Sequence, residues 1–535
     1  MPSISRRAFL SGVAAGGVAA TGIALGSGAA AHAAPVGARV RQVPVTRQDH
    51  RVVVIGSGFG GGVSALRFAQ AGVPVVVLER GIRWPSGPDA DTFPSASAPD
   101  KRALWCRSNP QLFGRPVAFD PYPGLFEAVV GDNMTAMCAA GLGGGSLVYQ
   151  GMSLQPSEEV FAQWFPGEID WATMDSEYYP RVSRMLGLEV APDELVESPN
   201  YQPARVFARR VRDAGLPLEK IPMPIDWDYA LAELRGEMAP SYTNGDCAIG
   251  VNNGGKNSVD VTYLAQAEAT GLVDVRTCHE VRAVERAADG RWVVHVDRID
   301  MTGAVVENLI LTTGALVMAA GSVNTTKLLV RAAATGAIPD LPDRLGEGWG
   351  TNADRIYVWS DPTEPFGVEQ GGPVVYGSLN WSDPATAHTV IQASIPSMSL
   401  DMHSTMLVGY GVSNGRGSIR YDAGADQGVI AWPREGDDAI QDGSIGPTAQ
   451  AIVGPTGMLT DTNKIVPSTW HPLGGANMGD VCDVDGRVHG QRGLYVLDGA
   501  LMPGNTAACN PSMTIAAVAE RALDNLVRTD VGRTI

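Results

Sequence analysis

The most regular hydrophobic pattern lies near the start of the chain and predicts a compact βαβ unit. Residues 51–55 form a run of β-branched side chains typical of a buried parallel strand. A glycine-rich turn at 56–61 follows, and apolar residues at helical spacing run from 63 to 71 before Gly72 ends the helix. A second apolar run at 73–78 predicts the next strand, so the unit spans about 30 residues.

Similar apolar runs recur far along the chain. They predict strands at 273–277 and 291–296 around an Asp289-Gly290 turn, further strands at 316–320 and 494–497, and helices at 324–334 and 512–527. Because these elements suit the same α/β sheet as the first unit, we expect one discontinuous Rossmann-like domain. It is assigned to 50–83, 257–345 and 486–535.

Between these pieces the pattern changes. Residues 83–128 are Pro-rich with little periodicity, and helices are expected at 156–165 and 174–186. From 354 to 422, extended segments alternate with Gly, Pro and Asn, which favours an antiparallel sheet. The sequence therefore predicts an inserted α+β domain, assigned to 84–256 and 346–485.

The N-terminus resembles an export signal. Ser5, Arg6 and Arg7 precede a weakly hydrophobic Ala/Gly/Val run, the outline of a twin-arginine signal peptide. Ala31 to Ala33 fits a small-x-small cleavage site, so the signal is assigned to 1–33 and the mature protein is expected to be secreted. The alternative is a membrane anchor, but a span needs about 20 strongly apolar residues and this run is mostly Ala and Gly.

Composition and charge narrow the class of protein. The 535 residues are 44% hydrophobic and 18% charged, as in ordinary globular proteins. The 40 basic and 57 acidic residues give a net charge of -17, and no basic block interrupts the mature sequence. Nucleic acid is therefore not an expected partner.

The cysteines carry no metal-binding pattern. The six are Cys106, Cys138, Cys247, Cys278, Cys482 and Cys509. They form no C-x-x-C pair and no cluster with histidines at ligand spacing, so no metal site is predicted. We expect buried free thiols with at most one disulfide.

The glycine turn carries a dinucleotide motif. Gly56, Gly58 and Gly61 follow the spacing G-x-G-x-x-G, which allows a tight turn, close approach of a pyrophosphate and close helix packing. Glu79 ends the next strand 23 residues after Gly56, where an acid can accept a ribose hydroxyl. FAD and NAD share this motif. A further strand with Asp498 near the C-terminus favours a flavin held from both ends of the chain.

Two later motifs add candidate chemistry. Gly141 to Ser146 holds four glycines in five positions, which suits contact with a flat ring or a phosphate, although a bulged strand or hairpin loop is the simpler interpretation. His471 is one of eight histidines and would by itself more often be a core residue. Together with Asn510 it offers a base and an amide donor for one alcohol oxygen.

These segments resemble the glucose/methanol/choline (GMC) family of flavin oxidoreductases, and within it the bacterial cholesterol oxidases that hold FAD non-covalently. The similarity covers 56–81, 141–152, 255–265, 320–350, 400–417 and 470–526. It implies that the discontinuous domain binds FAD and that the inserted domain binds the substrate.

The resemblance also implies roles for individual residues. The expected FAD contacts are Gly56, Gly58, Gly61 and Glu79 on the ADP half, Val281 at the adenine, Asp498 and Gly499 at the ribityl and pyrophosphate region, and Gly144, Gly145, Tyr149, Gly151, Met152 and Ser512 near the flavin ring. His471 is expected to orient the substrate hydroxyl and manage its proton, with Asn510 donating to the same oxygen. Cys138 and Tyr149 leave covalent attachment of the flavin open.

The activity implied is oxidation of a secondary hydroxyl of a sterol or similar bulky hydrophobic alcohol to a ketone, with dioxygen reduced to hydrogen peroxide. We expect a monomer with at most transient contact with a membrane surface. The alternatives are a related dehydrogenase, an oxidase for a non-sterol polycyclic alcohol, and a flavin-containing binding protein without turnover.

Two positions depart from the cholesterol oxidase pattern. Tyr149 stands where that pattern has Asn, and Asp401 stands where it has the Glu that moves a proton during double-bond isomerisation. Aspartate keeps the carboxylate but is one methylene shorter, so Asp401 is either a proton carrier or a solvated loop acid.

Overall fold

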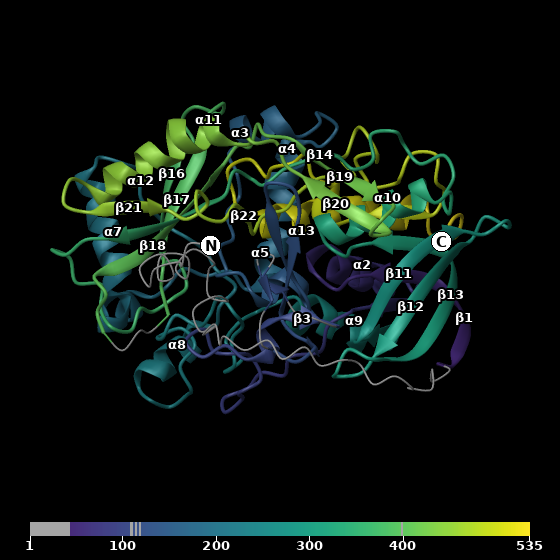
Figure 1. Cartoon of the computed structure of the whole chain (residues 1–535), viewed down its shortest axis with the longest axis horizontal. Coiled ribbons are helices and arrows are strands. Elements are labelled where there is room, and N and C mark those ends of the chain that lie inside the picture. The colour runs from purple at the N-terminus through teal and green to yellow at the C-terminus, as the bar shows by residue number, and fades with distance from the viewer. Residues whose placement is uncertain (1–42, 108–110, 113–114, 117–118, 397–399) are drawn as a thin grey trace.

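The computed structural model describes residues 43–107, 111–112, 115–116, 119–396 and 400–535. The predicted signal at 1–33 lies outside these residues. Figure 1 shows two sheets at opposite ends of the molecule with helices α5 and α13 between them.

One end of the molecule is built on a seven-stranded sheet. Its order is β10 (Val273–Arg276), β2 (Val75–Leu78), β1 (Val45–Ile55), β13 (Val305–Met318), β12 (Trp292–Ile299) and β11 (His279–Arg286), with β23 (Leu494–Val496) also paired to β13. β1, β2, β10, β13 and β23 run parallel, and β11 and β12 extend the sheet as an antiparallel meander. Strands from three distant segments therefore share one sheet, and the expected discontinuous α/β fold is confirmed. The domain boundaries stay predictions.

Helices cover the parallel part of this sheet, which explains its sequence. Residues 52–55 and 75–78 are buried at every position, since α2 (Phe59–Gln70) packs on β1 and β2 and α13 (Pro511–Thr529) packs in turn on α2, while α10 (Ser322–Ala334) contacts β11. Residues 45–51 of β1 instead alternate between exposed and partly buried positions. This part of the strand pairs with the stretch of β13 that borders the antiparallel meander.

One predicted hairpin is wrong. The Asp289-Gly290 turn joins β12 to β11, whereas β10 pairs in parallel with β2. β11 was missed because its sequence, His-Glu-Val-Arg-Ala-Val-Glu-Arg, alternates charged and apolar residues on a half-exposed surface.

The other end holds the expected antiparallel sheet. Its six strands are, in spatial order, β21 (Met458–Asp461), β15 (Arg355–Ser360), β18 (Ser404–Gly411), β17 (His388–Ala393), β16 (Tyr376–Asn380) and β9 (Glu219–Lys220). Helices α7 (Gln202–Asp213) and α12 (Gly446–Val453) pack beside this sheet in Figure 1. Tyr410 of β18 packs on His471, so this sheet borders the candidate catalytic residues.

Shorter elements connect the two sheets. The strands are β3 (Trp105–Cys106), β4 (Gln111–Leu112), β5 (Arg115–Pro116), β6 (Tyr122–Pro123), β7 (Phe126–Val130), β8 (Thr135–Ala139), β14 (Glu347–Trp349), β19 (Gly417–Asp422), β20 (Gln427–Ala431) and β22 (Ser468–Thr469). The α-helices are α3 (Glu158–Trp164), α4 (Trp171–Thr173), α5 (Tyr179–Leu186), α6 (Asp193–Glu197), α8 (Trp227–Leu234), α9 (Ala265–Ala269) and α11 (Asp438–Ile440). Turns of 3-10 helix are η1 (Lys101–Ala103), η2 (Gly144–Leu147), η4 (Pro199–Tyr201) and η7 (Gly499–Leu501), and π-helical turns are η3 (Met174–Tyr178), η5 (Asp260–Leu264) and η6 (Gln441–Ile445).

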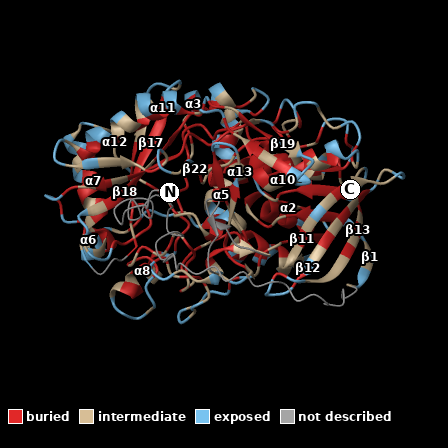
Figure 2. Ribbon diagram, viewed as in Figure 1, coloured by how far each residue is buried: buried red, intermediate tan, exposed pale blue. Residues whose placement is uncertain are grey.

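The buried core is continuous between the two ends (Figure 2). One apolar cluster includes Val54 of the first sheet, Leu523 of α13 and Trp359 of the second sheet. Both sheets therefore pack against the central helices, and movement of one end relative to the other would expose this core.

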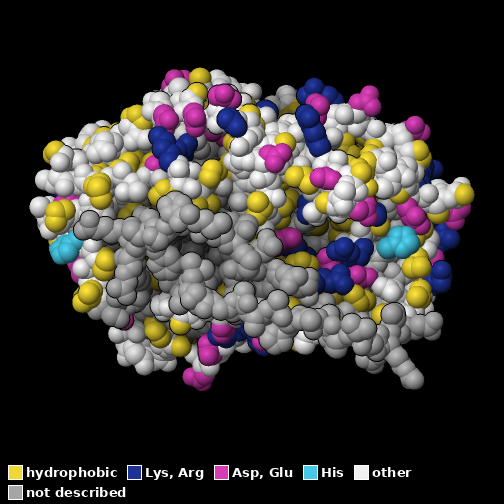
Figure 3. Space-filling view, viewed as in Figure 1, with side chains coloured by type: hydrophobic (Ala, Val, Ile, Leu, Met, Phe, Trp, Pro, Cys, Tyr) yellow, Lys and Arg dark blue, Asp and Glu magenta, His cyan; other side chains and the backbone are white. Residues whose placement is uncertain are grey.

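The surface and the thiols complete the description. On the face drawn in Figure 3, Lys and Arg lie among Asp and Glu. All six cysteines fall within the described residues and are free thiols, so the single disulfide that the sequence allowed is absent. Within the described ranges, no helix has the length and apolarity needed to span a bilayer, and no group of three or more His, Cys, Asp or Glu side chains could hold a metal.

Candidate active site

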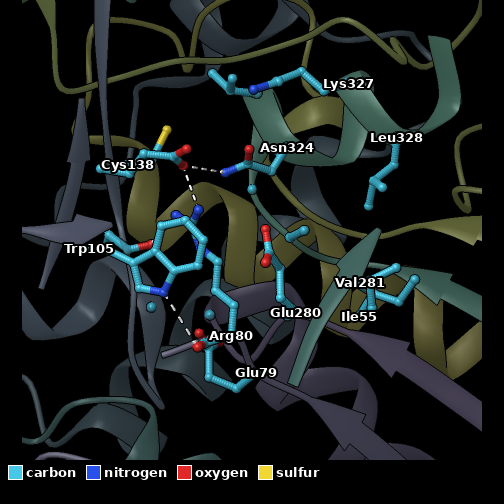
Figure 4. Close-up of a pocket in the computed structure, with 18 of the residues that line it drawn as sticks. Ile55, Glu79, Arg80, Trp105, Cys138, Glu280, Val281, Asn324, Lys327 and Leu328 are labelled. Carbon is cyan, nitrogen blue, oxygen red and sulfur yellow. Dashed lines mark hydrogen bonds and ion pairs between the residues drawn. The ribbon is translucent and has the colours of Figure 1, made fainter. Parts of the chain in front are cut away.

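A cavity of about 1300 Å³ opens where the parallel strands end. Its lining includes the residues that follow β1, β2, β13 and β23, which is the usual place for a ligand in an α/β sheet. Figure 4 shows Glu79 and Val281 on one side of this cavity, with Asn324 and Lys327 of α10 on another. Four distant segments of sequence thus meet around one elongated space.

The dinucleotide motif forms the floor of the cavity. A Cβ on Gly56, which has φ +96°, would lie 2.2 Å from the carbonyl oxygen of Ala319, and a Cβ on Gly61 would lie 2.1 Å from the carbonyl oxygen of Gly56. Gly58 precedes α2 without a side chain to cap it, so amide groups of the first helical turn are free to bind phosphate. The motif therefore does what its spacing predicts: it brings bare backbone to the cavity.

Glu79 is held rigidly at the cavity wall. Its Oε2 accepts a hydrogen bond from Ser57 Oγ at 2.5 Å, and its Oε1 accepts from the amide of Gly81 at 2.8 Å and from that of Gly141 at 3.2 Å. Oε2 accepts only this one bond from the residues that the structure describes and keeps a lone pair for a ribose hydroxyl. Ser57, which the sequence did not single out, fixes this acid.

The second glycine segment lies directly against the first. It forms the 3-10 helix η2 instead of a bulged strand or hairpin loop. A Cβ on Gly144, at φ +54°, would lie 2.8 Å from the Cα of Gly58. Gly145 is exposed and lines the cavity, and a Cβ at this position would meet no protein atom within 4 Å, so a ligand can lie against its backbone.

The far walls of the cavity come from later segments. Val281 lines it from β11, and Asp498 and Gly499 line it after β23. Asp498 Oδ2 accepts from Thr325 Oγ1 at 2.6 Å and from the amide of Gly321 at 2.8 Å, and burial raises the pKa of this carboxyl to about 6. This acid therefore joins the start of α10 to the C-terminal segment.

The sequence also missed a polar group at the cavity. Arg80 forms an ion pair with Glu127, and its guanidinium stacks 4.6 Å from the ring centre of Trp105. Asn324 and Lys327 lie close by in Figure 4. These residues come from β3, β7, α10 and the end of β2, elements far apart in sequence whose meeting at the cavity depends on the whole fold.

His471 and Asn510 meet next to the cavity. Asn510 Nδ2 lies 3.3 Å from His471 Nε2, and the neighbours of the histidine, Trp470 and Pro472, line the cavity. The His471 side chain is 11% exposed, and burial lowers its pKa to about 4. At neutral pH the imidazole is therefore an uncharged base.

Asn510 has a second task that fixes its orientation. It is the N-cap of α13, and its Oδ1 accepts from Ser512 Oγ at 2.8 Å and from the Ser512 amide at 3.2 Å. With the oxygen committed to the helix, the NH₂ group points at His471. The start of the terminal helix and the His471–Asn510 pair thus share one residue.

An apolar surface adjoins this pair. The Tyr410 ring meets the His471 ring edge-on at 5.5 Å, and Tyr410 Oη lies 3.5 Å from Met152 Sδ. Its cluster comprises Met152, Leu154, Ile221, Val374, Ile391, Tyr410 and Cys509. Several of these residues lie on or beside the antiparallel sheet, which supplies an apolar boundary next to a base.

Four residues expected at the flavin are placed behind the cavity wall. Tyr149, Gly151, Met152 and Ser512 are not among its lining residues, and Ser512 Oγ lies 3.2 Å from the carbonyl oxygen of Met152. Ser512 contacts Asn510 and Met152 contacts Tyr410, whereas Tyr149 packs on Phe59 and Gly151 lies beside Met223 and Pro224. A direct contact of these four with the flavin ring stays a prediction.

Tyr149 is accommodated by a buried lysine. Lys256 Nζ lies 5.0 Å from the centre of the Tyr149 ring and donates to the carbonyls of Leu147 and Tyr149. Burial lowers the pKa of Lys256 to about 8 and raises that of Tyr149. Among the described residues the Tyr149 hydroxyl has no hydrogen-bond partner.

Asp401 does not join this site. Its Oδ1 accepts from the amide of His403 at 2.8 Å and its Oδ2 from the amide of Gly367 at 3.0 Å. The carboxylate therefore stabilises a partly exposed loop, which agrees with the alternative of a loop acid. Both of its oxygens accept from backbone amides of this loop, and a role for Asp401 in proton transfer stays a prediction.

Comparison with known proteins adds a family match. Two models described as GMC oxidoreductase match residues 16–345 and 436–519. Cholesterol oxidase of Mycobacterium tuberculosis is 28% identical over 89% of this chain and 91% of its own length, and that of Acinetobacter baumannii is 25% identical over 90% and 94%.

More distant relatives differ in substrate. Paromamine 6'-oxidase of Streptomyces fradiae is 23% identical over 92% of this chain and 94% of its own length. The solved structure of pyridoxine 4-oxidase from Mesorbium loti superposes with a TM-score of 0.63 at 16% identity, over 89% of this chain and 99% of that one. That likeness shows the fold.

Proposed function

This chain belongs to the GMC oxidoreductase family of FAD-binding flavoproteins that act on CH–OH groups, and from that membership we propose that it oxidises a secondary hydroxyl of a sterol or similarly bulky hydrophobic alcohol. The product is a ketone, and dioxygen takes up the electrons as hydrogen peroxide. The observation that carries the proposal is the buried His471–Asn510 pair beside a cavity built for a dinucleotide.

The cavity fits FAD by its own geometry. Its floor is bare backbone at Gly58 and Gly145, free amides face it from the start of α2, and Glu79 presents a rigid acceptor. Val281 and Asp498 line the same space. When bound, FAD supplies the two-electron acceptor for the hydrogen of the carbinol carbon.

The protein's own groups handle the proton and the orientation. Since burial keeps His471 uncharged above about pH 4, its Nε2 can accept the hydroxyl proton as the carbinol is oxidised. Asn510 donates a hydrogen bond to the same alcohol oxygen and limits its rotation. The surrounding apolar side chains exclude water.

The apolar boundary supports a hydrophobic substrate. Tyr410 packs on His471 and belongs to an apolar cluster with Met152, Ile221, Val374 and Ile391, which favours a hydrophobic over a sugar-like alcohol. We propose that the ketone is released without double-bond isomerisation, because Asp401 is engaged elsewhere. Export through the twin-arginine motif at Ser5 to Leu10 is part of the same proposal.

A substrate screen tests the function. Purified yellow holoenzyme is mixed without oxygen with sterols, other polycyclic alcohols, long-chain alcohols and paromamine, and loss of the flavin absorbance is followed. We expect sterols or other polycyclic secondary alcohols to bleach the flavin and to yield ketones whose double bond has not moved. Bleaching by paromamine alone, or by no alcohol, would contradict the proposal.

Re-oxidation separates an oxidase from a dehydrogenase. Air should restore the flavin absorbance and release hydrogen peroxide at the rate of alcohol consumption. Turnover that proceeds with an artificial dye but not in air would favour the dehydrogenase.

A further inference from the structure

The hydrogen bonds of Asn510 determine which nitrogen of His471 carries its proton. Asn510 Oδ1 is fixed by Ser512, so Nδ2 is the atom that faces His471 Nε2 at 3.3 Å. An amide N–H can only donate, and Nε2 must therefore be the unprotonated nitrogen of the neutral ring. The ring proton then lies on Nδ1.

His471 Nδ1 faces a buried acid. It has no hydrogen-bond partner among the described residues, and Asp354 Oδ2 lies 4.0 Å away. Asp354 is 4% exposed, its Oδ2 accepts from the amide of Trp470 at 2.7 Å, and its Oδ1 also lacks a partner in the described part of the chain. A closure of about 1 Å, or one bridging water, would join the two groups.

The backbone around Asp354 is built to hold this position. Asn352 and Ala353 have φ of 56° and 52°, a left-handed conformation that residues other than glycine rarely adopt. Asn352 donates from Nδ2 to the carbonyl of Cys509 at 2.8 Å and accepts at Oδ1 from the amide of Thr506 at 3.0 Å. One strained turn therefore secures the loop before Asn510 and presents Asp354 to His471.

We propose that Asp354 is a positioning residue that keeps His471 in its Nδ1–H form and stabilises the imidazolium produced when the substrate proton reaches Nε2. The inference rests on the proposed function and deepens it at the same site. When the alcohol binds, its O–H takes the place of the Asn510 N–H at Nε2, and Asn510 donates to the alcohol oxygen. The alcohol O–H bond then breaks, its proton binds Nε2, and bound FAD would accept the hydride of the carbinol carbon. His471 then carries protons on both nitrogens, and the Asp354 carboxylate faces the Nδ1–H.

The charges around Asp354 set the sign of the pH dependence. Burial is the main cause that raises the pKa of Asp354 to about 7, and the negative charge of Asp437 acts in the same direction. Hydrogen bonds from Trp470 and Thr469 lower this pKa and offset part of the shift. His471 and Tyr410, the other titratable groups of this corner, are uncharged at neutral pH because burial lowers the pKa of His471 and raises that of Tyr410. Asp354 is therefore a carboxylate mainly above pH 7, so alcohol oxidation should quicken as pH rises through that value.

The kinetic test compares two acid-to-amide variants of the holoenzyme. Flavin bleaching by the alcohol found in the screen is timed without oxygen from about pH 5 to about pH 9, on both sides of the pKa of Asp354. We expect the wild-type rate to rise through about pH 7, and Asp354→Asn to lose this rise and roughly 10–100-fold of the alkaline rate. Asp442→Asn, which alters an exposed acid beside Lys464, should keep the wild-type profile. An unchanged profile in Asp354→Asn would overturn the proposal.

A second readout needs no substrate. Oxidised holoenzyme with ¹⁵N-labelled histidine is titrated by NMR, with the His471 signals identified from their loss in His471→Gln. We expect the spectra to show that Nδ1 is protonated and Nε2 is not. The chemical shift of Nδ1 should change once near pH 7, as Asp354 ionises, and Asp354→Asn should remove this change.

This titration separates the two proposals. A wild-type Nδ1 signal without that step, or a step that persists in Asp354→Asn, would overturn the role of Asp354 whether or not an alcohol substrate is found. If no alcohol bleaches the flavin while the step is present, the proposed function fails and the contact between Asp354 and His471 stands.

Discussion

At the scale of single residues, burial decides the chemistry of the site. His471 is uncharged because it is out of water, and Asn510 is a donor because its oxygen is used by the helix that it caps. Asp354 places its carboxyl group in the protein interior, where burial makes the negative charge costly and raises the pKa. The burial of His471 and the approach of Asp354 to it follow from segments distant in sequence, which is why residue type alone could nominate His471 and Asn510 but gave Asp354 no role.

Replacing the base should separate proton handling from cofactor binding. We expect His471→Ala to lower the rate of alcohol-dependent flavin bleaching by roughly 10²-fold or more, because no other group takes the hydroxyl proton. The flavin absorbance per protein should stay at the wild-type level, since His471 does not line the cavity. His489→Ala, at an exposed histidine, is the control and should change neither quantity. Unchanged bleaching in His471→Ala would remove this residue from the mechanism.

At the scale of elements, local patterns were predictable and contacts between them were not. The βαβ unit could be read from the sequence because its strands are buried on both faces and its helix begins in glycine. β11 could not, since its half-exposed surface hides the strand pattern. Asp401 was assigned by position along the chain, whereas the direction of a loop carboxylate depends on which amides lie near it, here those of Gly367 and His403.

The two glycine turns should respond differently to the same added methyl group. A Cβ on Gly61 meets the carbonyl oxygen of Gly56 at 2.1 Å, so Gly61→Ala must displace α2 from the sheet and should reduce both soluble protein and flavin content. A Cβ on Gly145 meets no protein atom within 4 Å, so Gly145→Ala should fold normally and lose only affinity for FAD. Flavin release is measured by fluorescence during dilution, with far-ultraviolet circular dichroism as the check on folding. Equal flavin retention in Gly145→Ala and wild type would show that the cofactor does not lie on this backbone.

At the scale of the whole molecule, one buried acid ties its parts together. Glu520 of α13 is fully buried, and its two oxygens accept from Arg67 of α2 at 2.6 and 2.7 Å. It also accepts from Tyr263 at 3.0 Å and from Arg181 of α5 at 3.2 Å. Arg67, Tyr263 and Glu520 come from the first, middle and last segments of the discontinuous domain, and Arg181 comes from a helix of the insertion. All four meet at one carboxylate between the two sheets.

Removing this acid should weaken the whole molecule and not one element. In Glu520→Ala, two partly buried guanidinium groups lose a shared partner, and we expect a loss of about 3 kcal/mol in the free energy of unfolding. Glu177→Gln is the matched control, because Glu177 binds the same Arg181 from an exposed position, where an i,i+4 pair contributes roughly 0.3–0.5 kcal/mol. Urea denaturation of the holoenzyme is followed in parallel by flavin fluorescence, which reports the first sheet, and by tryptophan fluorescence, to which Trp359 of the second contributes. If Glu520 joins the ends into one unit, both signals move to lower urea together; a shift of the flavin signal alone would mean that the second sheet is stable without it.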